Sequence, residues 1–133
     1  QTKNISPSRQ QRMQARPPIT SAAIVDAWER QDACRSRLLQ WMAQYDVLIC
    51  PASATPAQLI DTEGGDGPDD GAWPYTGVFS STGWPVVVVR CGSSKGGLPI
   101  GLQIVAPPWR DDIAIAVAIY LESRSGGWQR PPV

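Results

Sequence analysis

Two serines beside a lysine are the residues of this chain that come nearest to a catalytic motif. They lie in the glycine-rich hexapeptide Gly92-Ser93-Ser94-Lys95-Gly96-Gly97. A neutral lysine can take a proton from a serine hydroxyl, so these residue types could supply a nucleophile and its base. The hexapeptide, however, separates two predicted strands, and a lysine in an exposed turn stays hydrated and protonated. We therefore predict a polar turn here and no catalytic residue.

The chain contains no histidine among its 133 residues. This removes the Ser-His-Asp and Cys-His mechanisms from within the chain, together with zinc sites built on histidine. Cys34, Cys50 and Cys91 are widely spaced and odd in number, unlike a disulfide framework or a CxxC pair. We predict three free, mostly buried thiols in a cytoplasmic protein that has neither a metal site nor a cofactor.

Charge and hydropathy exclude further classes of protein. Twelve basic and twelve acidic residues cancel, so no basic field attracts nucleic acid or an anionic membrane. No apolar run approaches the ~20 residues that a membrane helix needs. The acidic stretch 61–70 fails the calcium-loop template, because Ala72 stands where that template needs glutamate. We expect this stretch to be a solvated part of a long loop over residues 52–74.

The first half of the chain has the pattern of a helix followed by a strand. Residues 22–45 lack glycine and proline, and Thr20 or Ser21 can cap a helix there. Its apolar face is expected to hold Cys34, Leu38, Trp41 and Tyr45. Residues 47–50 then form a short buried strand that Pro51 ends, which favours an α/β layer architecture. Residues 1–18 are expected to be an irregular lead-in, and residues 19–133 to form one structural unit.

The second half has the pattern of a β-hairpin between two helical segments. Residues 75–83 predict one or two helical turns ended by Gly83. Residues 85–91 and 98–105 predict two strands around a glycine-rich turn. Residues 111–124 predict a closing helix, which begins with two aspartates. Its inward stripe is expected to be Ile113, Val117, Tyr120 and Leu121.

Residues 76–105 carry a family resemblance. The run FSSTGWP at 79–85, a β-branched strand, Cys91-Gly92, and the run GLPIGLQIV at 97–105 follow in that order. Together they resemble the C-terminal region of the amidase signature family. Residues 46–51, the closing helix and residues 128–132 extend the resemblance to about residues 20–132. Departures from the family pattern fall at Ser80, Trp84 and Arg90, none of which touches its chemistry.

The resemblance implies the C-terminal part of the amidase-signature fold, a mixed sheet flanked by helices with a β-hairpin and a closing helix. It also implies hydrolysis of a small-molecule amide by a Ser-cis-Ser-Lys triad that lies upstream. This chain starts at Gln1 rather than Met, so we expect that a missing N-terminal portion completes the fold. Alternatives are an A-type subunit of a tRNA-dependent amidotransferase and a non-catalytic truncated product. The intact enzyme could also form a homodimer.

The resemblance places the segment before residue 82 at the substrate end of the cleft. Trp73, Tyr75, Thr76 and Phe79 are therefore the predicted substrate-binding residues, with loop 52–74 as a movable wall. The alternative for Tyr75 and Phe79 is that they pack the core. Gln103 lies within a buried strand, and we expect its side chain to satisfy backbone groups there.

Overall fold

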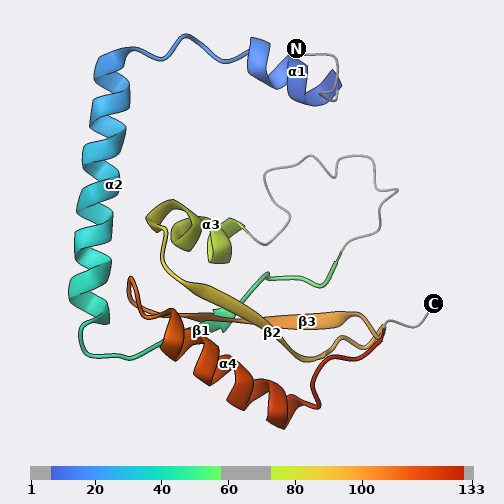
Figure 1. Ribbon diagram of the computed structural model, residues 1–133. Helices are drawn as coiled ribbons and strands as arrows, with labels where there is room; N and C mark the ends of the chain where they lie inside the picture. Colours follow the sequence, from blue (N-terminus) through green and yellow to red (C-terminus); the bar gives the residue numbers. More distant parts are fainter. Residues whose placement is uncertain (1–6, 58–72, 131–133) are drawn as a thin grey trace.

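The computed structural model describes residues 7–57 and 73–130 (Figure 1). The described chain contains four helices and three strands. They are α1 (Pro7–Gln14), α2 (Ser21–Met42), β1 (Leu48–Pro51), α3 (Trp73–Thr82), β2 (Val86–Ser93), β3 (Pro99–Val105) and α4 (Asp111–Ser125). The predicted stretch 61–70 lies outside the described residues, as does most of loop 52–74.

The three strands form an antiparallel sheet in the order β1-β3-β2. The predicted hairpin is confirmed: β2 and β3 pair from Val86↔Val105 to Ser93↔Pro99, with a register shift between Arg90 and Gly92. β1 lies on the other side of β3. A Cβ added at Gly101 would lie 3.1 Å from Val88 Cγ1, so a glycine fits this crowded point of the hairpin. The resemblance implies a mixed sheet, but both strand pairs among the described residues are antiparallel.

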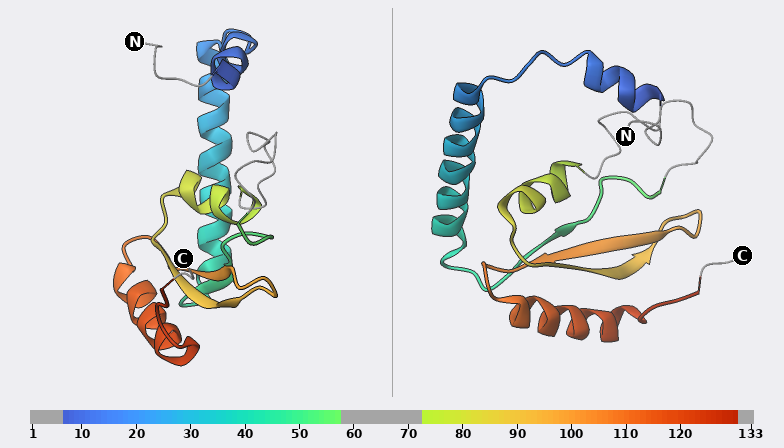
Figure 2. Two further views of the ribbon diagram at one scale, coloured as in Figure 1. Left: turned by 90° about the vertical axis from the view of Figure 1, so that its right-hand side faces the viewer. Right: turned by 45° about the horizontal axis from the view of Figure 1, so that its top comes forward.

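Helices cover both faces of this sheet, as the α/β class requires (Figures 1 and 2). α3 lies over one face and α4 over the other. On the α3 side, Met42, Phe79, Trp84 and Val105 form the hydrophobic core. Side chains alternate along a strand, so Ile104 faces α4, where Ala114 and Ala118 are also buried. The short alanine side chains let the helix approach the sheet closely.

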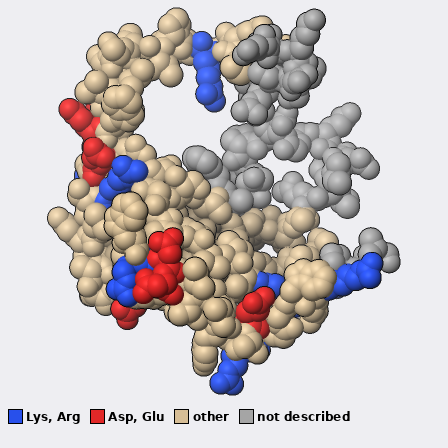
Figure 3. Space-filling view, in the orientation of Figure 1, with Lys and Arg blue, Asp and Glu red and all other residues tan. Residues whose placement is uncertain are grey.

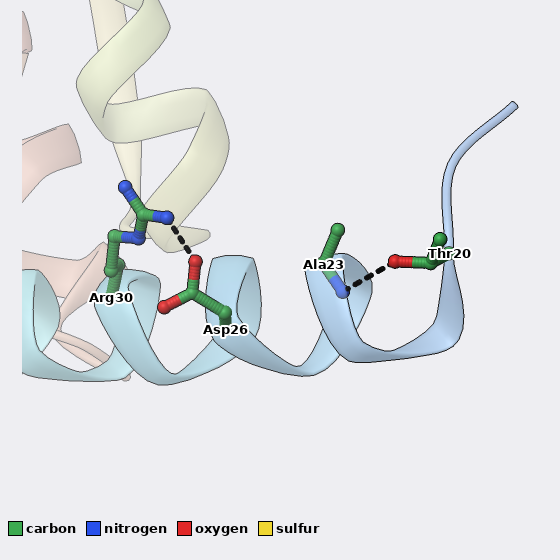
Figure 4. Close-up of polar contacts among 4 residues, drawn as sticks. All are labelled: Thr20, Ala23, Asp26 and Arg30. Atoms are coloured by element: carbon green, nitrogen blue, oxygen red, sulfur yellow. Dashed lines mark hydrogen bonds and ion pairs between the residues drawn. The ribbon is translucent and has the colours of Figure 1, made fainter. Parts of the chain in front are cut away.

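The predicted long helix is present as α2. Thr20 is its N-cap, and its Oγ1 accepts a hydrogen bond of 3.2 Å from the Ala23 N–H (Figure 4). One turn later Arg30 pairs with Asp26, at the i, i+4 spacing. The C-terminal end of α2 packs on the core through Met42 and the half-buried Leu38. Its N-terminal half extends beyond the sheet (Figure 1).

Three predictions about local structure need correction. Residues 7–14 of the lead-in are helical, because Pro7 suits a first helical position and strong helix formers such as Gln, Arg and Met follow. On α4, Tyr120 is exposed, and the buried residues are the alanines. Cys34 and Cys91 are exposed, so the three free thiols are not mostly buried.

Much apolar surface is uncovered in this chain. Large side chains are open on α2, on α4 and in the segments beside α4: Trp28 is 62% exposed, Ile119 63%, Trp128 74% and Trp109 92%. Charged residues of both signs lie scattered between broad uncharged areas on the face shown in Figure 3. Large apolar surface left open in a folded protein often marks a contact site for another part of the protein or for a partner.

Candidate functional site

Helix α3 carries all four predicted substrate-binding residues. Trp73 begins the helix, and its side chain lies outside the described part of the structure. Tyr75 and Thr76 are half-buried in the first turns. Phe79 is 7% exposed, and its ring centroid lies 6.4 Å from that of Trp84. The structure thus places the four residues on one short helix, with Phe79 turned into the core.

The N-terminal turn of α3 is held by Gln103 of β3. The side chain of Gln103 is 2% exposed, and its Nε2 donates to the Tyr75 carbonyl at 3.0 Å. The same Nε2 lies 3.1 Å from the Cys50 Sγ on β1. The prediction that Gln103 satisfies a backbone group is confirmed. One buried amide therefore ties β3, β1 and α3 together.

The C-terminal end of α3 is held from α2. The Ser81 carbonyl accepts a hydrogen bond from Gln31 Nε2 at 2.5 Å and one from Arg35 Nη2 at 3.4 Å. Carbonyls in the last turn of a helix lack intrahelical donors and carry partial negative charge, so a cationic partner suits them. Sequence reasoning missed both residues, because nothing in a helical periodicity says which polar side chain meets another element.

A hollow of about 590 Å³ lies between α2 and α3. Its walls are mostly apolar, with polar groups from Arg30, Gln31 and Ser81 at its edge. Its apolar lining includes Trp28, Cys34, Pro74, Gly77 and Val78. Among the predicted residues whose side chains the structure describes, which are Tyr75, Thr76 and Phe79, none lines this hollow. The hollow is therefore lined by other residues of α3 than Tyr75, Thr76 and Phe79.

The serines of residues 92–97 serve the hairpin turn. The Ser94 Oγ accepts from the Leu98 N–H at 3.2 Å, and the Ser93 Oγ accepts from Arg90 Nη2 at 2.6 Å. Lys95 is exposed in the turn, and Gly97 has a φ of 82°. Both hydroxyls are thus bonded within the hairpin, as a turn requires.

Arg110 and Asp112, at the start of α4, have pKa values shifted by their mutual contact. A hydrogen bond from Arg110 lowers the pKa of the Asp112 carboxyl, and the same contact raises the pKa of Arg110.

Within the described residues, no three His, Cys, Asp or Glu side chains gather as metal ligands. None of the helices described there is long and apolar enough to cross a membrane. Helix α3 can shape a pocket, but its sequence contains no charged residue that could act as an acid or a base.

Comparison with known proteins gives a consistent picture. A family model described as Amidase matches residues 3–114. Fatty-acid amide hydrolase 2 of Homo sapiens is 51% identical over 57 residues, which is 43% of this chain and 11% of that protein. The A-type subunit of the glutamyl-tRNA(Gln) amidotransferase from Brevibacillus brevis is 35% identical over 95 residues, covering 68% of this chain and 19% of that protein.

Solved structures agree with the sequence matches. A crystal structure described as an amidase superposes with a TM-score of 0.81 and 27% identity. The match covers 93% of this chain but 30% of the solved one. The chain thus spans less than a third of the length of each of these proteins.

Proposed function

The chain belongs to the amidase family, and we propose that it is the C-terminal part of an enzyme that hydrolyses a small-molecule carboxylic amide. The observation that carries this proposal is the alignment of 93% of the chain on 30% of a solved amidase at a TM-score of 0.81. In this proposal the chain packs against the remaining portion of the same fold. That portion would cover the apolar side chains that are open on α2 and α4.

The chemistry of this proposal resides outside the chain. A serine nucleophile, a bridging serine and a neutral lysine would form the Ser-cis-Ser-Lys triad, and backbone N–H groups would hold the oxyanion. In this proposal the chain supplies none of those groups, and the exposure of Lys95 and the bonding of Ser93 and Ser94 within their turn support it. Its own contribution is a wall of the acyl site, built on α3.

Within that wall we assign the acyl contacts to Trp73, Tyr75 and Thr76. Phe79 supports them from the core, where it packs on Trp84. Aromatic side chains next to a backbone turn suit an apolar or aryl acyl group, because they offer a large contact area with little flexibility. The intact enzyme would work in the cytoplasm and could form a homodimer.

A second candidate is an A-type subunit of a tRNA-dependent amidotransferase. The similarity to the Brevibacillus brevis protein favours it, since that match covers 68% of the chain. Such a protein would pass the freed ammonia to a partner subunit rather than release it. A truncated product without catalysis is the third candidate.

The test begins with the complete gene. The proposal expects an upstream lysine and a Gly- and Ser-rich segment with two serines, and an open reading frame without them would contradict it. The intact enzyme should release the chromophore from an aryl anilide, and alanine at the nucleophile should abolish this. The 133-residue chain should show no turnover above a boiled control. Co-purification of the intact protein with a B-type subunit would favour the amidotransferase instead.

A further inference from the structure

Gln103 is the most deeply buried polar side chain of the described chain, at 2% exposure against 8% for Thr82. An amide removed from water costs free energy unless hydrogen bonds replace the lost hydration. An apolar residue would fill the same space without this requirement. The reason for an amide at this position therefore lies in the elements that its hydrogen bonds connect.

The two acceptors of Gln103 lie on different elements. Cys50 is its partner in the β1–β3 ladder, so that contact stays within the sheet. The Tyr75 carbonyl belongs to the first turn of α3 and is 28 positions away along the chain. A hydrogen bond has a narrow range of distance and angle, so the second contact fixes the height and rotation of that turn above the sheet.

The other end of α3 has separate supports. Ser81 is bonded by Gln31 and Arg35, and Phe79 packs among Trp84, Met42 and Val105. Loss of the Gln103 contact would therefore leave the helix docked by its C-terminal half. The freed part would be the first turn, where Trp73, Tyr75 and Thr76 lie.

We propose that Gln103 is a positioning residue, which sets the orientation of the first turn of α3 and through it the shape of the acyl site. The second half of this statement rests on the proposed function. Catalytic and binding groups need support to within about half an ångström, and a buried amide between a strand and a helix can give it. Gln103 itself need not touch the substrate.

The experiment compares three variants of the intact enzyme. Gln103→Met has a similar length but no donor. Gln103→Asn keeps the amide but is one methylene shorter, and it also guards against failure of the methionine variant to fold. Gln31→Met is the matched control, because it removes a glutamine contact from the other end of the same helix. Backbone hydrogen exchange in α3 and kcat/KM for a small and a bulky acyl amide are measured for each.

Both Gln103 variants should speed exchange in residues 73–78 more than in residues 79–84. They should also change the ratio of kcat/KM values for the two amides by about tenfold, the scale of a misfit in an apolar pocket. Gln31→Met should speed exchange in residues 79–84 and leave that ratio within about twofold. If Gln103→Asn showed the wild-type exchange rates and the wild-type ratio of kcat/KM values, the proposal would be overturned, because the shorter amide cannot reach the Tyr75 carbonyl.

Two further outcomes separate this inference from the proposed function. A uniform rise in exchange across β1, β3 and α3 with an unchanged ratio would make Gln103 a core residue only, and the inference would be wrong. If the wild-type enzyme cleaves neither amide, the proposed function fails. The exchange pattern of residues 73–78 against 79–84 then still decides whether Gln103 positions the helix.

Discussion

The rings of Phe79 and Trp84 lie 6.4 Å apart at an interplanar angle of 38°, on either side of the turn that ends α3. Phe79 belongs to the helix, and Trp84 precedes β2. Both are at most 7% exposed. Tilted aromatic pairs at this separation are favourable beyond the area they bury. The contact fixes the direction in which the chain leaves the helix and enters the sheet.

Truncation of Phe79 should therefore act on stability. Phe79→Ala in the intact enzyme is expected to lower the free energy of unfolding by about 3–5 kcal/mol, because it leaves a cavity beside Trp84 and Met42. Phe79→Leu, which fills most of that space, should cost less. Thermal or denaturant unfolding checks this. A variant of normal stability with altered substrate preference would instead place Phe79 directly in the acyl site.

Gly83 ends α3 in a left-handed conformation, with a φ of 70°. An alanine there meets no close neighbour, since the nearest atom to an added Cβ is Arg35 Nη2 at 4.0 Å. The expected loss of stability for Gly83→Ala is therefore backbone strain alone, about 1–2 kcal/mol. Gly96→Ala is the matched control: its backbone is not left-handed and its nearest neighbour lies 3.9 Å away. Equal melting temperatures for the two variants would contradict this account.

The local elements of this chain were largely predictable from the sequence. Thr20 marks the start of α2, and Gly83 and Gly126 mark the ends of α3 and α4, because caps and left-handed turns depend on neighbouring residues only. Ile115, Ile119 and Tyr120 lie on the exposed part of α4, so apolar residues surround this helix and periodicity cannot select the buried face.

The candidate site was predictable only in part. The motif placed four residues on one segment, but it could not show that Phe79 turns inward. Gln103 could be marked as a buried polar group in need of partners, whereas the identity of its acceptor on α3 depends on tertiary packing. No local sequence pattern distinguishes Gln31 and Arg35 from the other polar residues of α2, because their contacts with α3 depend on how the two helices pack.

The isolated chain should be only marginally stable. Trp28, Ile119, Trp109 and Trp128 are more than half exposed, and the sheet ends in open strands. Each large apolar side chain left in water forfeits roughly 1.5–3 kcal/mol, against a typical total stability of about 5–15 kcal/mol. We expect self-association in analytical ultracentrifugation and strong binding of a hydrophobic dye. A monodisperse monomer with one cooperative thermal transition would count against this expectation.

Trp73 begins the helix that we place in the acyl wall, and it offers a direct test of that placement. Trp73→Ala in the intact enzyme should alter the preference between small and bulky acyl groups by about 1–3 kcal/mol, because a large contact surface is lost from the pocket. The melting temperature should change little. Preference is measured as the ratio of kcat/KM values for two amides that differ only in the acyl group.

The matched control for this change is Trp128→Ala. Trp128 is 74% exposed and follows the end of α4, the helix that covers the opposite face of the sheet from α3. Its loss removes the same ring from the protein without touching the predicted wall, so the preference ratio should stay at the wild-type value. A sharp fall in melting temperature for Trp73→Ala, with an unchanged ratio, would show that Trp73 packs in the interior of the intact enzyme. The acyl wall would then have to be sought on the other face of α3, where Val78 and Trp28 line the hollow between the two helices.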